Sequence, residues 1–104
     1  MDRNKFYLKV GDSNAEGYLN DDGSFKVLAR ALVAPVKTMK GYRKLREQLE
    51  MNGVIGAGVF MVDYTFRNHS AATSVVRGSS TANSTLWMTA DGYSLKKALE
   101  EIPQ

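Results

Sequence analysis

The single histidine of the sequence, His69, is followed directly by a serine, Ser70. A serine nucleophile needs a base and an orienting group that the fold brings together, and neighbours in sequence do not generally point at one another. The G-x-S-x-G turn that exposes the nucleophile of many hydrolases is also absent from the sequence. We therefore interpret His69 as a surface residue, or as part of a helix cap beside Asn68, rather than as a catalytic base.

Two pairs of adjacent carboxylates, Asp21-Asp22 and Glu100-Glu101, are the other candidates for acid–base chemistry. Catalytic carboxylates owe their shifted pKa to burial or to a close charged neighbour. The first pair lies in a predicted turn and the second in a predicted terminal helix, so we expect both pairs to be solvated. The residues thus predict no catalytic site, and we expect a protein that is not an enzyme.

Thiol-based sites and multi-histidine metal sites are excluded by composition. The sequence has no cysteine and one histidine. It therefore cannot form disulfides, zinc–thiolate sites, iron–sulfur clusters or a multi-histidine metal site within one chain. We expect no metal and no cofactor.

Positive charge is concentrated in one stretch of the chain. The sequence has 14 basic and 11 acidic residues, a formal net charge of +3. Residues 26–46 contain half of the cations and no acid: Lys26, Arg30, Lys37, Lys40, Arg43, Lys44 and Arg46. A positive surface attracts polyanions, of which nucleic acid is the commonest. A solvated helix face with no partner explains the same stretch equally well.

Length and composition indicate one soluble domain. The chain has 104 residues, of which 43% are hydrophobic and 24% charged, close to the averages for globular domains. No apolar run approaches the ~18–20 residues of a membrane helix, and the N-terminus does not resemble a secretory signal. We expect a single domain over residues 1–104, located in the cytoplasm and without membrane contact.

Hydrophobic periodicity predicts strands in the first third of the chain. Phe6–Val10 alternates apolar and polar residues, and 16–19 can form a short second strand. The Asn20–Gly23 segment predicts a hairpin turn, because Asn, Asp and Gly tolerate positive φ angles. Residues 24–34 are a third strand candidate whose apolar content also permits a helix.

The middle of the chain predicts an amphipathic helix over Met39–Met51. Tyr42, Leu45 and Leu49 fall on one helical face, so the cations of this segment would lie outside the core contact. Gly53 follows where a helix commonly ends. Residues 54–58 are glycine-rich but lack the spacing and the Lys-Ser/Thr of a phosphate-binding loop, so we interpret them as a flexible loop.

The remaining residues complete a small α+β domain. The alternation over 59–66 is the clearest strand, and residues 70–77 predict a short helix capped by Asn68 and ended by Gly78. We also expect a short strand at 86–88 and a last helix that begins after Ser94 and is lined by Leu95, Leu99 and Ile102. The expected architecture is a small antiparallel sheet with about three short helices packed against it.

An ordered set of motifs resembles a known family. The motifs are Gly23-Ser24-Phe25-Lys26-Val27, the basic helix followed by Gly53, Phe66-Arg67-Asn68-His69-Ser70-Ala71-Ala72, Val75-Val76-x-Gly78, Ala82-Asn83, Trp87 and Asp91-Gly92-x-Ser94-Leu95. Over residues 17–99 this set resembles domain of unknown function 4357, and it is similar to the related RAMA (restriction-enzyme adenine-methylase associated) module. Asn68-His69 and Asn83-Ser84 depart from that pattern, which has Ser-Pro and Asn-Gly there.

The resemblance implies a non-catalytic accessory module that binds DNA, including modified DNA, in a restriction or anti-phage context. DNA binding needs cations for the phosphates and planar or amide groups for the bases. We expect Lys37, Lys40, Arg43, Lys44 and Arg46 to supply the first, and Arg67, Asn68, Asn83 and Trp87 the second. Packing in the core is the favoured alternative for Trp87, and helix capping is at least as good for Asn68.

A second function explains the same features. A small chain without catalytic groups is also suited to be a protein-binding inhibitor or adaptor, encoded by a phage or mobile element, whose basic patch faces an acidic protein partner. Whether the ligand is DNA, RNA or protein stays open at this level. An exposed edge strand at Phe6–Val10 would in addition permit a homodimer.

Overall fold

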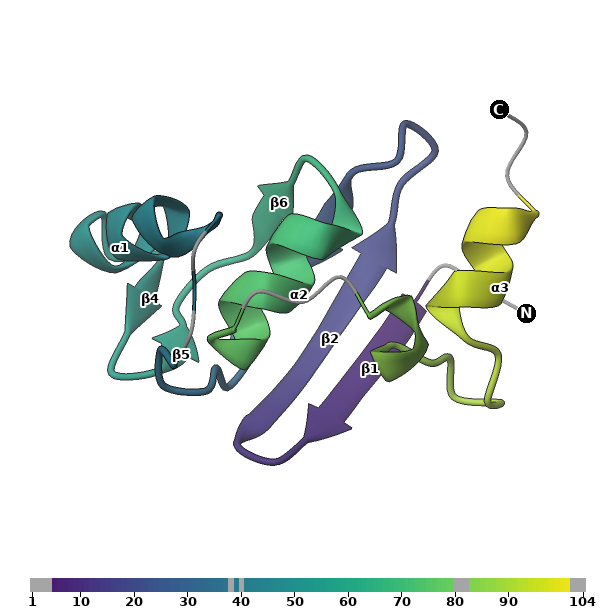
Figure 1. Cartoon of the computed structure of the whole chain (residues 1–104), viewed down its shortest axis with the longest axis horizontal. Coiled ribbons are helices and arrows are strands. Elements are labelled where there is room, and N and C mark those ends of the chain that lie inside the picture. The colour runs from purple at the N-terminus through teal and green to yellow at the C-terminus, as the bar shows by residue number, and fades with distance from the viewer. Residues whose placement is uncertain (1–4, 38, 40, 80–82, 102–104) are drawn as a thin grey trace.

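The computed structural model describes residues 5–37, 39, 41–79 and 83–101. It contains a four-stranded antiparallel sheet with the strand order β1-β2-β3-β6, a two-stranded sheet of β4 and β5, and several short helices (Figure 1). The predicted small α+β fold is confirmed. The elements are β1 (Lys5–Val10), β2 (Ser13–Leu19), β3 (Phe25–Val27), α1 (Arg43–Met51), β4 (Ile55–Gly56), β5 (Val59–Phe60), β6 (Tyr64–Phe66), α2 (His69–Arg77), the 3-10 helix η1 (Ser84–Leu86) and α3 (Leu95–Glu100).

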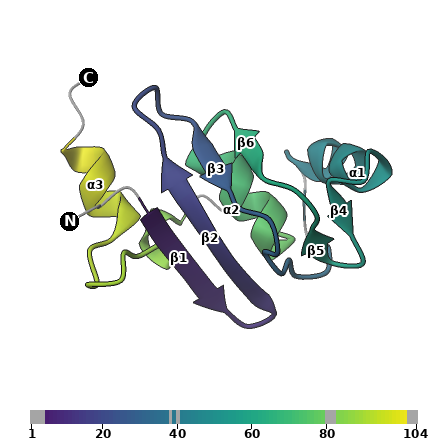
Figure 2. The same ribbon diagram turned by 180° about the vertical axis from the view of Figure 1, so that it is seen from behind.

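One face of the four-stranded sheet forms the core. Alternation along the strands buries one side of the sheet: Phe6, Leu8, Ala15, Leu19, Phe25, Val27 and Phe66. Helix α2 packs across this face against β2, β3 and β6 (Figure 1). Residues 71–76 of α2 are all buried, and small side chains such as Ala71 and Ala72 let the helix lie close to the sheet. The opposite face of β1 and β2 carries no helix (Figure 2).

The two longer predicted strands, residues 24–34 and 59–66, are both interrupted, and the two interruptions lie beside each other. Residues 24–34 give β3 and then an isolated bridge at Leu32, while 59–66 give β5 and β6. At the break, the side chain of Asp63 takes the place of a backbone carbonyl, because its Oδ1 accepts a hydrogen bond from the Ala29 N–H at 2.8 Å. Arg30 has a φ of 77° there, and its N–H donates to the Phe60 carbonyl. The first segment therefore bulges and then pairs again with β2 at Leu32, and the two segments stay hydrogen-bonded to each other through Ala31 and Phe60.

The glycine-rich segment is a tight turn rather than the flexible loop that we predicted. Ile55 pairs with Phe60 and Gly56 with Val59, so two residues connect β4 to β5. These residues, Ala57 and Gly58, have φ angles of 52° and 78°. Two successive positive φ angles are typical of a type I′ hairpin turn, in which the glycine is needed for its backbone angle.

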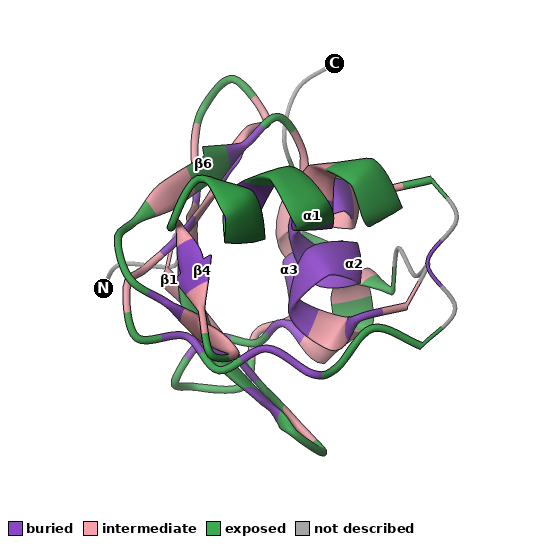
Figure 3. Cartoon of the chain, turned by 90° about the vertical axis from the view of Figure 1, so that its left-hand side faces the viewer, coloured by how far each residue is buried: buried purple, intermediate pink, exposed green. Residues whose placement is uncertain are grey.

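The helix ends agree with most of the predicted capping residues. Asn68 Oδ1 accepts a hydrogen bond from the Ala71 N–H, and Ser94 caps α3 in the same manner through the Lys97 N–H. Helix α2 ends at Gly78, which has a φ of 69°. Helix α1 begins at Arg43, four residues later than predicted, and Ile102 lies outside the described residues. In Figure 3 most of α1 is exposed, whereas α2 is largely buried.

The predicted strand at 86–88 is wrong. Its first residue ends η1, and Met88 makes only isolated bridges, to Tyr7 and Ser94. The Tyr7 N–H donates to the Met88 carbonyl at 2.7 Å, and the Met88 N–H donates back at 3.0 Å. The outer edge of β1 is therefore occupied at Tyr7, and pairing of this edge with a second copy stays a prediction. None of the helices in the described part of the chain has the length and apolar character needed to cross a membrane.

Candidate nucleic-acid interface

The cations predicted on α1 contribute less free charge than the sequence suggests. Arg43 and Lys44 are exposed, but Arg43 Nε lies 3.5 Å from the Glu47 carboxylate one turn further along the helix. Lys37 is exposed at another place, beside the end of α2, where its N–H donates to the Gly78 carbonyl. Lys40 lies outside the described residues.

Arg46 is a structural residue, which corrects the expectation that it contacts phosphates. It is 3% exposed. Its Nη1 donates to the Ala34 carbonyl at 2.9 Å and to the Val75 carbonyl at 3.0 Å, and its Nε lies 3.3 Å from the Glu50 carboxylate. The guanidinium thus joins α1 to α2 and to the segment before α1. With this burial and these partners, Arg46 acts within the fold rather than on its surface.

Trp87 is likewise removed from the candidate base-stacking residues. Its side chain is fully buried, and its ring centroid lies 4.7 Å from that of Phe25. The indole Nε1 donates to Thr73 Oγ1 at 2.9 Å. The core position, which strand alternation favoured, is therefore the one that the structure has.

The remaining predicted base contacts are Arg67, Asn68 and Asn83. Arg67 is exposed and lines a surface pocket of about 430 Å³ together with Tyr42 and Tyr64. The Asn68 side-chain oxygen is engaged in the cap of α2. The oxygen of Asn83, which is exposed, caps η1 by accepting from the N–H and hydroxyl of Thr85. Both amides thus have local structural roles, and neither side-chain oxygen is unoccupied.

The basic stretch of the sequence does not form one patch. Lys26 and Arg30 lie on or beside the main sheet, whereas Arg43 and Lys44 lie on α1 and Lys37 at the end of α2. The chain bends sharply between these positions, so proximity in sequence is lost in the fold.

The open face of the sheet collects cations and aromatic rings that the sequence analysis did not combine. We call this surface the open sheet face; it comprises Lys5, Tyr7, Lys9, Asn14, Glu16, Tyr18 and Lys26. The register places Lys5 opposite Tyr18 and Tyr18 opposite Lys26, with Tyr7 opposite Glu16 and Lys9 opposite Asn14. These side chains point away from the core because their neighbours in each strand are buried. No helix covers them in Figure 2.

Lys5 lies between the two tyrosines of this face. Its Nζ is 5.6 Å from the centroid of the Tyr7 ring and 5.9 Å from that of the Tyr18 ring, within the range of cation–π contacts. The same Nζ is 3.0 Å from Glu16 Oε1. A hydrogen bond to the Glu16 side chain is the main reason that the pKa of Lys5 is raised above its ordinary value. Lys5 and Glu16 thus form an ion pair on the surface of the sheet.

The other charges of the face are distributed around this centre. Lys26 Nζ lies 3.5 Å from Asp63 Oδ2. Lys9 is exposed, and no residue in the described ranges forms an ion pair with it. Together with Arg30 at its margin, the face carries four cations against two carboxylates, and both carboxylates are already paired.

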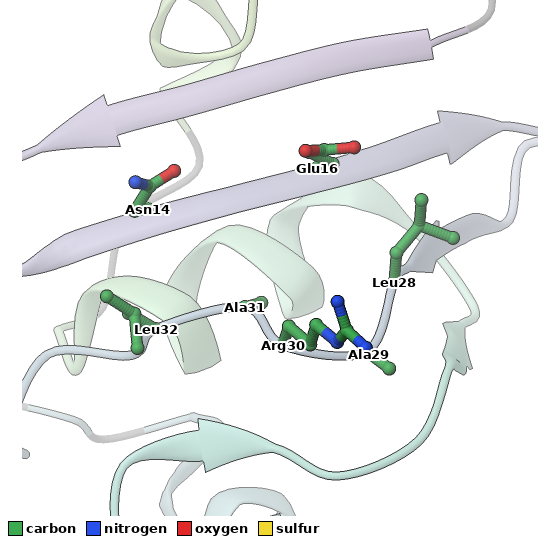
Figure 4. Close-up of a pocket in the computed structure, with 7 residues that line it drawn as sticks. All are labelled: Asn14, Glu16, Leu28, Ala29, Arg30, Ala31 and Leu32. Atoms are coloured by element: carbon green, nitrogen blue, oxygen red, sulfur yellow. The ribbon is translucent and has the colours of Figure 1, made fainter.

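A groove of about 460 Å³ borders the open sheet face beside β2 (Figure 4). It opens because the chain bulges over residues 29–31 between two contacts with β2, the Leu28 N–H to the Glu16 carbonyl and the Asn14–Leu32 pair. Asn14 and Glu16 line one side, and Arg30 and Leu32 line the other. An exposed guanidinium therefore stands at the rim of the groove.

One signal in the sequence could have identified this face. Once Phe6–Val10 is recognised as a strand with Phe6 and Leu8 inside, the residues between them must point outward, and they are Tyr7 and Lys9. The partner strand, predicted over residues 16–19, in fact begins at Ser13 and so includes Asn14. The cations of the face also come from two separate parts of the chain.

Comparison with known proteins gives one match. The sequence model of a family described as Domain of unknown function (DUF4357) matches residues 6–99. No curated protein and no solved structure matches the chain. Within the described residues, no group of three or more metal-ligating side chains is assembled.

Proposed function

Since the chain belongs to the family of domain of unknown function 4357, we propose that it is a non-catalytic module that binds nucleic acid through the open sheet face. The resemblance places such modules beside restriction and methylation components, and we propose the same restriction or anti-phage context and a cytoplasmic location here.

The observation that carries this proposal is the charge of an uncovered sheet surface. Lys5, Lys9, Lys26 and Arg30 surround two tyrosines, while Glu16 and Asp63 are occupied by ion pairs within the protein. Each protein cation that contacts a phosphate raises the affinity of the protein for nucleic acid, because it releases a counterion that was condensed on the nucleic acid. Both surfaces contain ion-paired cations, so the comparison depends on number: the sheet face and its margin carry four cations, whereas α1 presents two, Arg43 and Lys44, because Arg46 is buried.

Fluorescence anisotropy with labelled 20-nucleotide single-stranded and duplex DNA, titrated over roughly 50–200 mM salt, tests the proposal. The variant Lys9→Gln/Lys26→Gln removes two cations of the face, and Arg43→Gln/Lys44→Gln is its matched control on α1. Each pair contains one ion-paired cation, Lys26 or Arg43, and one cation without an ion pair in the described ranges.

We expect affinity to fall steeply with salt and the face variant to bind more weakly. The slope of log K against log salt should become shallower by about 1.4 for single strands, about 0.7 for each lost contact. The α1 variant should bind like the wild type. If the α1 variant binds more weakly than the face variant, the interface lies on α1. If no oligonucleotide binds in a salt-dependent manner, the proposed function is refuted. Capture of an acidic protein that survives nuclease treatment would then support the adaptor function.

A further inference from the structure

We infer that the open sheet face binds single-stranded nucleic acid, with bases stacked on Tyr7 and Tyr18. This inference rests on the proposed function and specifies the strand state of its ligand.

The two tyrosines are placed as neighbouring platforms. Tyr7 lies opposite Glu16 on β2, and Tyr18 is two residues further along that strand on the same face. Diagonal neighbours of this kind have Cα atoms about 7–8 Å apart. That separation suits two bases of an extended strand, which is spread more widely than the stacked bases of a duplex. Both tyrosines are partly exposed.

Lys5 contacts both rings and so favours their present arrangement. Its ammonium group is within 6 Å of both ring centroids and is held by Glu16. Side chains that are already ordered lose less conformational freedom on binding, so the rings contribute more of their stacking energy to affinity. Lys9 and Lys26 lie on either side of the tyrosines and are placed to contact the phosphates between successive bases.

The shape of the face favours a single strand over a duplex. A duplex turns its bases inward and is read by elements that enter a groove about 12 Å wide. The open sheet face carries no helix that could enter such a groove (Figure 2), and two concavities border it, the groove at Arg30 and a pocket of about 450 Å³ beside Tyr7, Lys9 and Met88. Only unpaired bases can lie flat on Tyr7 and Tyr18.

The test compares oligo(dT) of 20 nucleotides, oligo(rU) of the same length, and a 20-base-pair DNA duplex, all at one salt concentration. The variant Tyr7→Leu/Tyr18→Leu removes the rings, and Tyr7→Phe/Tyr18→Phe keeps them. Each lost stacking platform should weaken binding of the single strands by about 10-fold, whereas the Phe variant should bind as the wild type does. The DNA and RNA arms show which backbone is preferred.

Equal binding of duplex and single strands by the wild type, or unchanged affinity of the Leu variant, would overturn the inference. The proposed function would survive that result if Lys9→Gln/Lys26→Gln still weakened binding, and both would fail if no oligonucleotide bound. Emission from the buried Trp87 reports whether each variant is folded. If the double Leu variant unfolds, Tyr18→Leu alone and the wild-type preference for single strands decide the question.

Discussion

Trp87 and Thr73 are joined by a hydrogen bond in the middle of the core. The indole Nε1 donates to Thr73 Oγ1 at 2.9 Å, and the threonine hydroxyl in turn donates to the His69 carbonyl at 2.6 Å. The residue after η1 is thereby tied to α2 by a polar contact in which both side chains are fully buried.

Replacing Thr73 by Val should destabilise the protein by about 1–3 kcal/mol, because a buried indole N–H then has no acceptor. The expected result is a lower midpoint of urea unfolding. The matched control, Thr73→Ser, keeps the hydroxyl and should retain most of the stability. A larger loss in Thr73→Ser than in Thr73→Val would contradict this prediction, because it would assign the stability to the methyl group rather than to the hydrogen bond.

Replacing Arg46 by Met should cost about 2–4 kcal/mol, since the Ala34 and Val75 carbonyls both lose a donor. Arg43→Met is the control, because its exposed i,i+4 pair should change the free energy of unfolding by no more than about 0.5 kcal/mol. Urea unfolding measures both. A stable Arg46→Met variant that no longer binds nucleic acid would contradict this structural role and would show that Arg46 contacts the ligand.

Gly78 and Gly92 both have positive φ angles, 69° and 85°, but differ in their surroundings. A Cβ at Gly78 would lie 2.2 Å from the Pro35 carbonyl oxygen, whereas nothing lies within 4 Å of one at Gly92. Gly92→Ala should cost about 1–2 kcal/mol for its backbone angle alone. Gly78→Ala should cost at least about 1–3 kcal/mol more, for the overlap. Similar thermal midpoints for the two variants would contradict the close approach.

Replacing Ala57 by Gly should stabilise the protein by about 0.5–1 kcal/mol. Ala57 has a φ of 52° in the β4–β5 turn, where an L-residue with a side chain is strained and glycine is not. The same replacement in α3, Ala98→Gly, should have the opposite sign, because glycine lowers helix stability. Thermal unfolding distinguishes a raised midpoint from a lowered one.

Stability should fall as the pH drops below about 6.5, the ordinary pKa of histidine. Desolvation by burial lowers the pKa of His69 in the folded protein, and its Nδ1 has no hydrogen-bond partner in the described structure. The unfolded chain therefore binds the proton more readily, so the stability present above pH 6.5 is lost as the pH falls toward the folded pKa. We expect the unfolding free energy of the wild type to decrease more between about pH 7.5 and 5.5 than that of His69→Gln.

Local patterns predicted the elements better than the breaks within them. The caps at Asn68 and Ser94 and the stop at Gly78 follow from the chemistry of single residues, and they were predicted correctly. The interruption at Arg30 was not, because it depends on a side chain 33 residues further along the chain, Asp63, which replaces a carbonyl in the ladder. Sequence periodicity contains no information about such a distant partner.

The interface was harder to predict than the fold for a related reason. A run of cations in sequence indicates a patch only if the chain stays in one element, and residues 26–46 pass from β3 through the break into α1. Arg46 also looks like any other surface cation of an amphipathic helix, and only the two carbonyls that lie within its reach make it a core residue. The open sheet face depends on a register between strands that no single segment determines.

The pair of backbone hydrogen bonds between Tyr7 and Met88 also bears on the predicted pairing of β1 with a second copy. The outer rim of the first strand is closed at this one point by a segment from the far end of the fold. A shortened chain ending before Met88 would leave that rim as a template onto which strands of further molecules can add. We therefore expect that removing this segment would increase the tendency of the chain to self-associate at high concentration.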